Sequence, residues 1–130
     1  MKLEEIRQAL DAEWLGYKTI RNVYSGTEVL SCHASDLMSD VLSLNGLGSL
    51  LLTGLTNAQV IRAAEVCDFA AVCFVRGKAL QPEVVQLAEE RDIPLLVTPL
   101  SMFESCGRLY EKGLRGVDTT KENVRCRTRK

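Results

Sequence analysis

The residues from Cys32 to Asp36 are the part of the sequence whose side chains could most readily do chemistry. They bring a thiol, the only histidine of the chain and a carboxylate close together, and Ser35 adds a hydroxyl. Such groups can act as a nucleophile, its base and a residue that orients the base. Adjacent residues at the end of a strand point to opposite faces, so Cys32 and His33 are poorly placed to act as a pair. A small enzyme that uses Cys32, His33 and Asp36 is therefore kept only as an alternative.

His33 is open to other roles as well. It could contact a ligand, act as an acid or base, or be an ordinary loop residue. A metal ion would need further ligands, and the sequence places no cysteine or histidine other than Cys32 beside it. The sequence therefore predicts neither a metal site nor a cofactor.

The segment from Ser35 to Ser43 is predicted to form a helix that directly follows a strand. Ser35 and Asp36 can cap its first turn, and the apolar residues after them recur at helical spacing. The free amides and the dipole of a helix N-terminus favour a phosphate or a carboxylate, although the charge of Asp36 opposes a highly charged anion. We therefore expect this helix start to form one wall of a pocket for a small anionic ligand.

The other elements must hold this segment in place. Apolar runs predict strands over 49–53, 70–75 and 95–97, and extended segments are expected over 18–24 and 28–32. Helices are predicted over about 2–14, over 56–66 with Thr56 and Gln59 as a capping box, over 82–91 from Pro82, and from Ser101 to a stop at Gly113. This alternation indicates an α/β protein with three layers, α/β/α, around a mainly parallel sheet of four to five strands.

Right-handed connections bring the carboxyl ends of parallel strands to one edge of the sheet. Arg76 and Lys78 could supply the positive charge of an anion pocket there, or could simply be solvated loop charges. No glycine-rich phosphate loop is present, so an ATP-dependent kinase is not predicted. No catalytic residue is predicted. The candidate ligand-binding residues at this edge are His33, Ser35, Asp36, Thr53, Asn57, Arg76, Lys78, Thr98 and Ser101.

Length and composition favour a single domain. The chain has 130 residues, 46% of them apolar, and a net charge of −1, which gives no sign of nucleic-acid or membrane binding. No apolar run reaches the roughly 18 residues that span a bilayer. Five cysteines without a C-x-x-C pair and without an export signal predict reduced thiols in the cytoplasm, with Cys67, Cys73 and Cys106 buried and inert.

The carboxyl-terminal residues differ in composition from the rest. We expect the domain to cover residues 1–114 and to be followed by a basic tail over 115–130, which carries six positive and two negative side chains. A mobile tail is the simplest interpretation. Contact of the tail with a partner or with nucleic acid is the alternative.

Three segments carry a resemblance to a known family: ASDLMSDV over 34–41, Arg76-Gly77-Lys78 with the helix from Pro82 to Arg91, and IPLLVT over 93–98 with Phe103-Glu104 and LYEKG over 109–113. Over about residues 18–114 they resemble the DRTGG domain family, which is similar in fold to the N-terminal domain of HPr kinase/phosphorylase. Such domains also occur inside phosphate acetyltransferases and some CBS-containing pyrophosphatases. The likeness is greatest to small stand-alone members encoded near iron-only hydrogenase genes.

The resemblance implies a non-catalytic regulatory domain, often at a dimer interface, and hence a homodimer with a redox enzyme as a possible partner protein. The Asp-Arg-Thr-Gly-Gly signature is absent, and the corresponding loop here is His33 to Asp36. The favoured hypothesis is a regulatory or accessory domain that binds a small anionic ligand or a nucleotide. The alternative is a structural subunit that acts only through protein–protein contacts.

Overall fold

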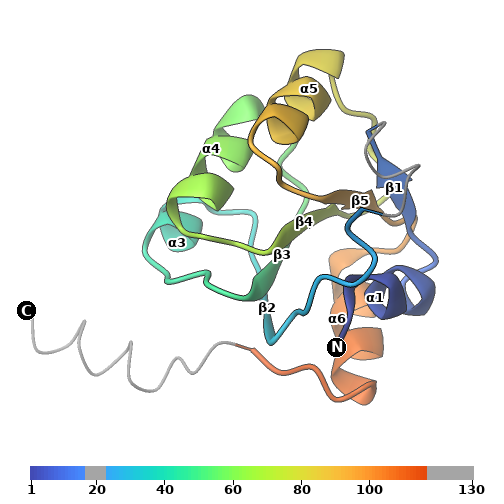
Figure 1. Ribbon diagram of the computed structural model, residues 1–130. Coiled ribbons are helices and arrows are strands. Elements are labelled where there is room, and N and C mark those ends of the chain that lie inside the picture. The colour runs from blue at the N-terminus through green and yellow to red at the C-terminus, as the bar shows by residue number, and fades with distance from the viewer. Residues whose placement is uncertain (17–22, 117–130) are drawn as a thin grey trace, which may run out of the picture.

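The computed structural model describes residues 1–16 and 23–116, which form a five-stranded sheet between two layers of helices (Figure 1). The strands lie in the order β1-β5-β4-β3-β2. Strands β2 to β5 are parallel to one another, and β1 pairs with β5 in the antiparallel direction. Their bounds are β1 Glu13–Leu15, β2 Ser31–Ala34, β3 Ser49–Thr53, β4 Ala71–Phe74 and β5 Leu95–Val97.

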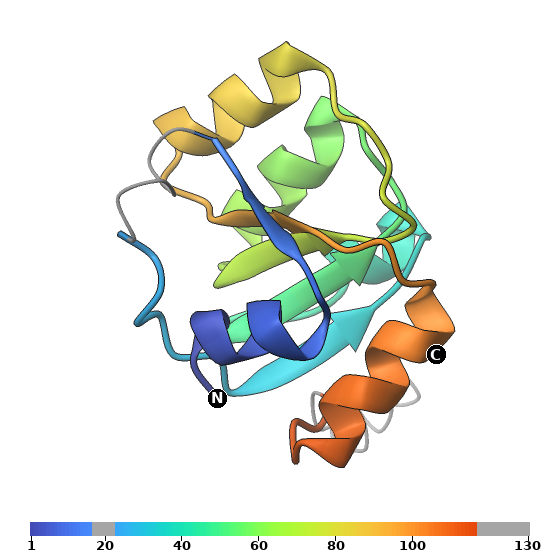
Figure 2. The ribbon, with the colours of Figure 1, turned by 90° about the vertical axis from the view of Figure 1, so that its right-hand side faces the viewer.

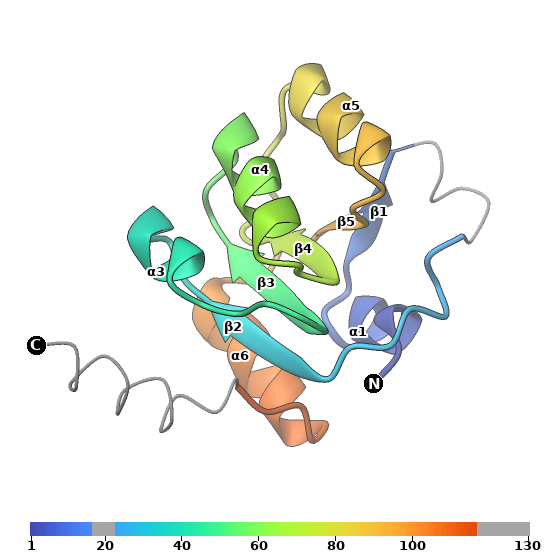
Figure 3. The same ribbon diagram turned by 60° about the vertical axis from the view of Figure 1, so that its left-hand side comes forward.

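Within residues 1–16 and 23–116, five helices cover the two faces of the sheet. Helices α3 (Met38–Leu42), α4 (Ala58–Val66) and α5 (Pro82–Glu90) connect the parallel strands and pack on one face (Figure 3). Helices α1 (Leu3–Ala9) and α6 (Met102–Glu111) pack on the other face (Figure 2). The predicted α/β/α class with a mainly parallel sheet is confirmed.

The central strand β3 shows why the fold forms. All five of its residues are buried, because helices cover both faces of the sheet. Leu51 belongs to the apolar cluster under α4 and α5, whereas Leu50 and Leu52 belong to the cluster that includes Leu3 and Leu109 from α1 and α6. The alternation of side chains along an extended backbone thus divides one continuous apolar run between two cores.

The predicted N-terminal helix over about 2–14 is wrong in its second half. Helix α1 ends at Ala9, and the backbone turns at Asp11, which has a left-handed φ of 51°. Aspartate tolerates this conformation better than most residues. Trp14 then lies in β1 opposite Leu96, so its helical spacing to Leu10 is incidental.

Two expected extended segments can be compared with the structure. The segment expected over 28–32 is found as β2, displaced toward the carboxyl end at Ser31–Ala34. Most of the strand expected over 18–24 lies outside the described residues, and its last two, Val23 and Tyr24, are in a turn.

Two predicted helix starts are also corrected. Helix α3 begins at Met38, and the residue at its N-cap position, Leu37, makes no side-chain capping bond. Asn57, not Thr56, caps α4, since its side chain accepts a hydrogen bond of 3.3 Å from the amide of Val60. Pro82 in the first turn of α5 and Ser101 as the cap of α6 are confirmed.

The chain after α6 returns to the free edge of the sheet. The amide of Cys32 donates a hydrogen bond of 2.9 Å to the carbonyl of Arg115, and Gly116 forms an isolated parallel bridge with Cys32. Arg115 and Gly116 therefore contact the domain, whereas the rest of the predicted tail lies outside the described residues.

Candidate functional site

Gly54 joins two of the predicted site residues at the carboxyl ends of the parallel strands. Its amide donates a hydrogen bond of 2.6 Å to Oδ1 of Asp36, which follows β2. Its carbonyl accepts a hydrogen bond of 2.7 Å from Nζ of Lys78, which follows β4. One peptide segment after β3 therefore holds a carboxylate and an ammonium group side by side.

Glycine at position 54 allows this close approach. A Cβ atom there would lie 3.2 Å from both Asp36 Oδ1 and Lys78 Nζ, closer than most Cβ contacts in proteins. Any larger residue would push the two charged groups away from the backbone. We call Asp36, Gly54 and Lys78 the strand-end site.

Thr53, the last residue of β3, holds both Asp36 and the loop after the strand in place. Its buried hydroxyl donates to Asp36 Oδ1 at 3.3 Å and accepts from the amide of Leu55 at 3.1 Å. With these bonds the loop after β3 is fixed, and the hydroxyl has no further hydrogen to offer a ligand. Thr53 is thus a positioning residue rather than a contact for a ligand.

The polar atoms that remain available belong to Asp36 and Lys78. Oδ2 of Asp36 accepts no hydrogen bond from the residues described, and two of the three Nζ hydrogens of Lys78 have no partner there. Both side chains are exposed. The site can therefore donate to an anionic group and accept from a hydroxyl or amino group of one ligand.

Ser35 and His33 lie near the strand-end site but are not part of it. Ser35 Oγ accepts a hydrogen bond of 3.1 Å from the amide of Leu37, which orders the turn before α3 instead of capping a helix. His33 is opposite Leu51 in the sheet and points to the same face as that residue. Its Nε2 atom is buried and has no partner within the described chain, and burial lowers the pKa of its imidazole while Asp40 partly opposes this effect.

Arg76 is placed at the same edge of the sheet with its side chain exposed. It adopts a left-handed backbone conformation with a φ of 66°, followed by Gly77 with a φ of 62°. Its amide donates to the carbonyl of Leu100, and that of Gly77 to the carbonyl of Thr98. Its guanidinium makes no hydrogen bond or ion pair to the described residues, so it is free to approach a ligand.

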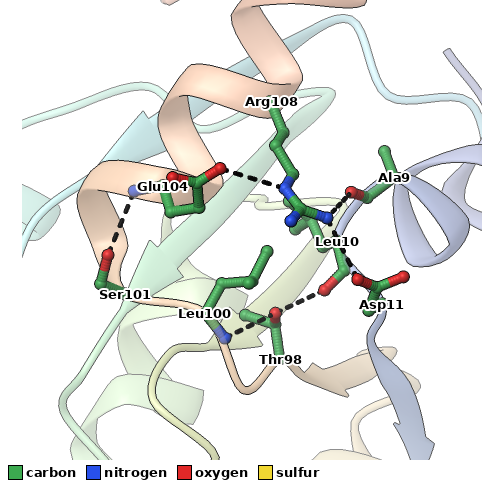
Figure 4. A network of polar contacts seen from close by, with 8 residues as sticks. All are labelled: Ala9, Leu10, Asp11, Thr98, Leu100, Ser101, Glu104 and Arg108. Atoms are coloured by element: carbon green, nitrogen blue, oxygen red, sulfur yellow. Dashed lines mark hydrogen bonds and ion pairs between the residues drawn. The ribbon is translucent and has the colours of Figure 1, made fainter.

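Thr98 and Ser101 serve the packing of α1 and α6 (Figure 4). Thr98 is buried, and its hydroxyl donates to the carbonyl of Leu10 at 2.6 Å and accepts from the amide of Leu100 at 3.2 Å. Ser101 Oγ accepts from the amide of Glu104 at 3.2 Å and caps α6. Like Asn57, which caps α4, these residues are not brought into the strand-end site.

Sequence reasoning missed two residues that organise this edge. Gly54 could have been found as the residue that closes an apolar strand where other backbone groups approach. For Arg108 the only local signal was Glu104 four residues before it, because its other two partners are distant in sequence. Its guanidinium contacts Asp11 at 3.1 Å, Glu104 at 3.2 Å and the carbonyl of Ala9 at 3.4 Å (Figure 4).

The geometry disfavours a cysteine nucleophile. Cys32 packs with the cluster under α6, on the opposite face from His33. Burial raises the pKa of the Cys32 thiol to about 12, so almost none of it is thiolate at neutral pH.

In residues 1–16 and 23–116 no three His, Cys, Asp or Glu side chains are grouped so that they could hold a metal ion. Nor does any helix of the described chain have the length and apolar character to cross a membrane.

Comparisons with known proteins identify the fold. No protein-family model matches the sequence, and a search of the curated proteins finds no match either. Among solved structures, the chain is similar to the CBS and DRTGG domains of the regulatory region of Clostridium perfringens pyrophosphatase, in complex with the activator diadenosine tetraphosphate. The TM-score is 0.65 at 17% sequence identity, over 83% of this chain. The chain matches 45% of the length of that structure. This likeness supports the DRTGG-like fold that the sequence resemblance implied.

Proposed function

We propose that this chain is a non-catalytic regulatory domain that binds a small anionic ligand, a nucleotide, at the strand-end site. The observation that carries the proposal is the pairing of Asp36 and Lys78 on either side of Gly54, each held by the backbone and each with unused polar atoms. Ligands of parallel α/β proteins bind outside the carboxyl ends of the strands, where this site lies.

The two charges select the kind of ligand. Lys78 can donate two hydrogen bonds to the oxygens of a phosphate, and the exposed Arg76 adds a second positive charge at the same edge of the sheet. Oδ2 of Asp36 repels a phosphate but accepts well from a ribose hydroxyl. A nucleotide presents both groups, whereas inorganic phosphate presents only the first.

The structural comparison supports the regulatory part of the proposal. The similar structure belongs to the regulatory region of a pyrophosphatase and is described in complex with a nucleotide activator. The site in this chain offers one route by which such a domain could respond to a nucleotide. Regulation then requires that the ligand bind one state of a partner or dimer more tightly than another.

The test is a titration of the full chain by calorimetry and thermal shift with AMP, ATP and diadenosine tetraphosphate. A ligand that binds the native state raises the unfolding temperature, so at least one nucleotide should do so at millimolar concentration. Lys78→Met should weaken that binding about tenfold, because it removes charge-assisted hydrogen bonds and keeps the aliphatic stem. Lys112→Met, which removes an exposed lysine at the end of α6, should leave binding unchanged. No stabilisation of the parent chain by any nucleotide overturns the proposal.

A structural interaction subunit is the second candidate, favoured by large apolar side chains on the surface. Leu30 is 72% exposed, Leu47 69%, Val66 74% and Phe103 88%. A homodimer and a redox enzyme as partner protein are proposed for the regulatory domain as well as for this structural subunit. Light scattering of the purified chain should then give a dimer, and a monomer that binds no nucleotide and co-purifies with no protein would contradict both candidates.

A further inference from the structure

A cavity of about 180 Å³ lies under the free edge of the sheet, on the face covered by α6. Cys32 and Ala34 of β2 line it from the sheet, and Cys106 and Leu109 line it from α6. Leu114 closes it from the segment after that helix. Figure 1 shows α6 on the opposite side of the sheet from α3 and α4. The cavity is therefore separate from His33 and from the helices that follow the strand-end site.

The size and lining of the cavity suit one apolar ring. The cavity is partly open to solvent, so a small ligand can enter it. An engineered apolar cavity of about 150 Å³ binds benzene. The sulfur atoms of Cys32 and Cys106 are polarisable and add no charge to the lining. Burial raises the pKa of both thiols and keeps them protonated. Sulfur also packs favourably against aromatic rings.

Arg115 gives the cavity a positively charged group in a fixed orientation. Its guanidinium stacks over the ring of Tyr110, 3.8 Å from the ring centroid. Its Nη1 atom donates to the carbonyl of Tyr110 at 2.9 Å and to that of Leu114 at 3.3 Å, which uses both Nη1 hydrogens. These three contacts hold the group without any carboxylate from the described part of the chain.

The other edge of this guanidinium is unused. Nε and Nη2 of Arg115 have no hydrogen-bond acceptor within residues 1–16 and 23–116. These two N–H groups form the parallel fork that binds both oxygens of one carboxylate. Both Arg115 and Tyr110 line the cavity and are exposed, so a ligand in the cavity can reach this fork from solvent.

We propose that this cavity binds a small aromatic carboxylic acid, with the ring between β2 and α6 and the carboxylate on the Nε and Nη2 edge of Arg115. This site is a second one, independent of the nucleotide proposed at Lys78. The ring replaces empty space beside Cys32, Ala34 and Leu109, and the carboxylate satisfies donors that have no acceptor among the described residues.

The probe is benzoate, which is titrated into the full-length chain. Its binding is followed by NMR spectroscopy through the amide resonances of β2 and α6. Benzyl alcohol has the same ring without the charge, and acetate has the charge without the ring. We expect benzoate to bind with a dissociation constant on the order of 1 mM, as befits a fragment of this size. Benzyl alcohol and acetate should each bind at least about tenfold more weakly.

Two variants separate the contributions of charge and cavity. Arg115→Met should weaken benzoate about tenfold and leave benzyl alcohol unchanged. Cys106→Leu should fill the cavity and abolish binding of both, whereas Cys106→Ala should retain both. Unfolding curves establish that each variant is folded, and Lys112→Met serves as the control for loss of a positive charge near the same helix end. The proposal is overturned if benzoate does not bind at about 10 mM, ten times the expected constant, or if neither Arg115→Met nor Cys106→Leu weakens it.

Discussion

The hydroxyl of Thr98 donates a hydrogen bond of 2.6 Å to the main-chain carbonyl of Leu10, which stands 88 positions earlier in the chain. The bond is buried and joins the end of β5 to the end of α1. It explains why a threonine that the sequence suggested as a ligand contact has no free hydrogen-bonding hydrogen for a ligand.

Replacement of Thr98 by valine should therefore destabilise the domain. Valine has nearly the same shape, so the change removes the hydroxyl and leaves the buried carbonyl of Leu10 without its donor. We expect a loss of about 1–3 kcal/mol in the free energy of unfolding, measured by urea denaturation. Thr98→Ser keeps the hydroxyl and should lose less. Equal stability of Thr98→Val and the parent chain would show that this bond contributes nothing.

The sequence predicts that Thr56 caps α4, whereas in the structure Asn57 is the cap. Asn57→Ala removes the side chain that accepts from the amide of Val60 and should cost about 0.5–2 kcal/mol. Thr56→Ala is the matched control, because Thr56 precedes the cap and should have the smaller effect. If urea denaturation shows that Thr56→Ala loses more free energy of unfolding than Asn57→Ala, the capping box predicted from Thr56 is right.

His33 should make stability depend on pH in a narrow range. Burial lowers its pKa from the ordinary value of 6.5, so between the lowered pKa and 6.5 the unfolded chain binds a proton that the folded chain does not. The free energy of unfolding then rises with pH through this range and falls as the pH is lowered through it. Below the folded pKa this group causes no further change.

The measurement is the urea midpoint at several pH values between about 5 and 7.5, a range that contains the ordinary pKa of histidine and of no other side chain. His33→Leu removes the only histidine and should flatten the slope. Asp40→Asn removes the charge that partly holds the imidazole pKa up, so it should extend the slope to lower pH. An unchanged slope in His33→Leu would assign the effect to other groups.

Cys32 should react slowly with alkylating agents in the folded protein. Its pKa of about 12, against an ordinary value of 9.0, corresponds to a thiolate fraction about a thousandfold smaller at neutral pH. Iodoacetamide labelling followed by peptide mass spectrometry should show this difference between native and guanidinium-unfolded chains. Rapid labelling of native Cys32 would instead favour the enzyme that uses Cys32, His33 and Asp36.

Gly54→Ala tests the geometry of the strand-end site. The added methyl group would lie 3.2 Å from the charged atoms of both Asp36 and Lys78, so these flexible side chains must move. We expect weaker nucleotide binding with only a small change in the unfolding temperature. Gly107→Ala is the control in α6, where a Cβ meets nothing within 4 Å, and helix propensity should make it about 0.5–1 kcal/mol more stable. Unchanged nucleotide affinity in Gly54→Ala would place the ligand elsewhere.

Much of the scaffold follows from the sequence alone. The strands β3, β4 and β5, the start of α5 at Pro82 and the cap of α6 at Ser101 were predicted close to their observed positions. Each depends on a signal within a few neighbouring residues: an apolar run covered on both faces, a proline without an amide hydrogen, or a serine beside free amides.

The tertiary structure decided what no local signal contains. Trp14 continues the apolar spacing of α1, yet pairing with Leu96 places it in a strand, because the edge of β5 offers hydrogen bonds that a lengthened helix would leave unmade. Asp36 looked like a helix cap, but the amide of Gly54 is the donor that it meets. The sequence supplied the groups able to form a site, and only the packing of β2, β3 and β4 side by side determined which of them face one another.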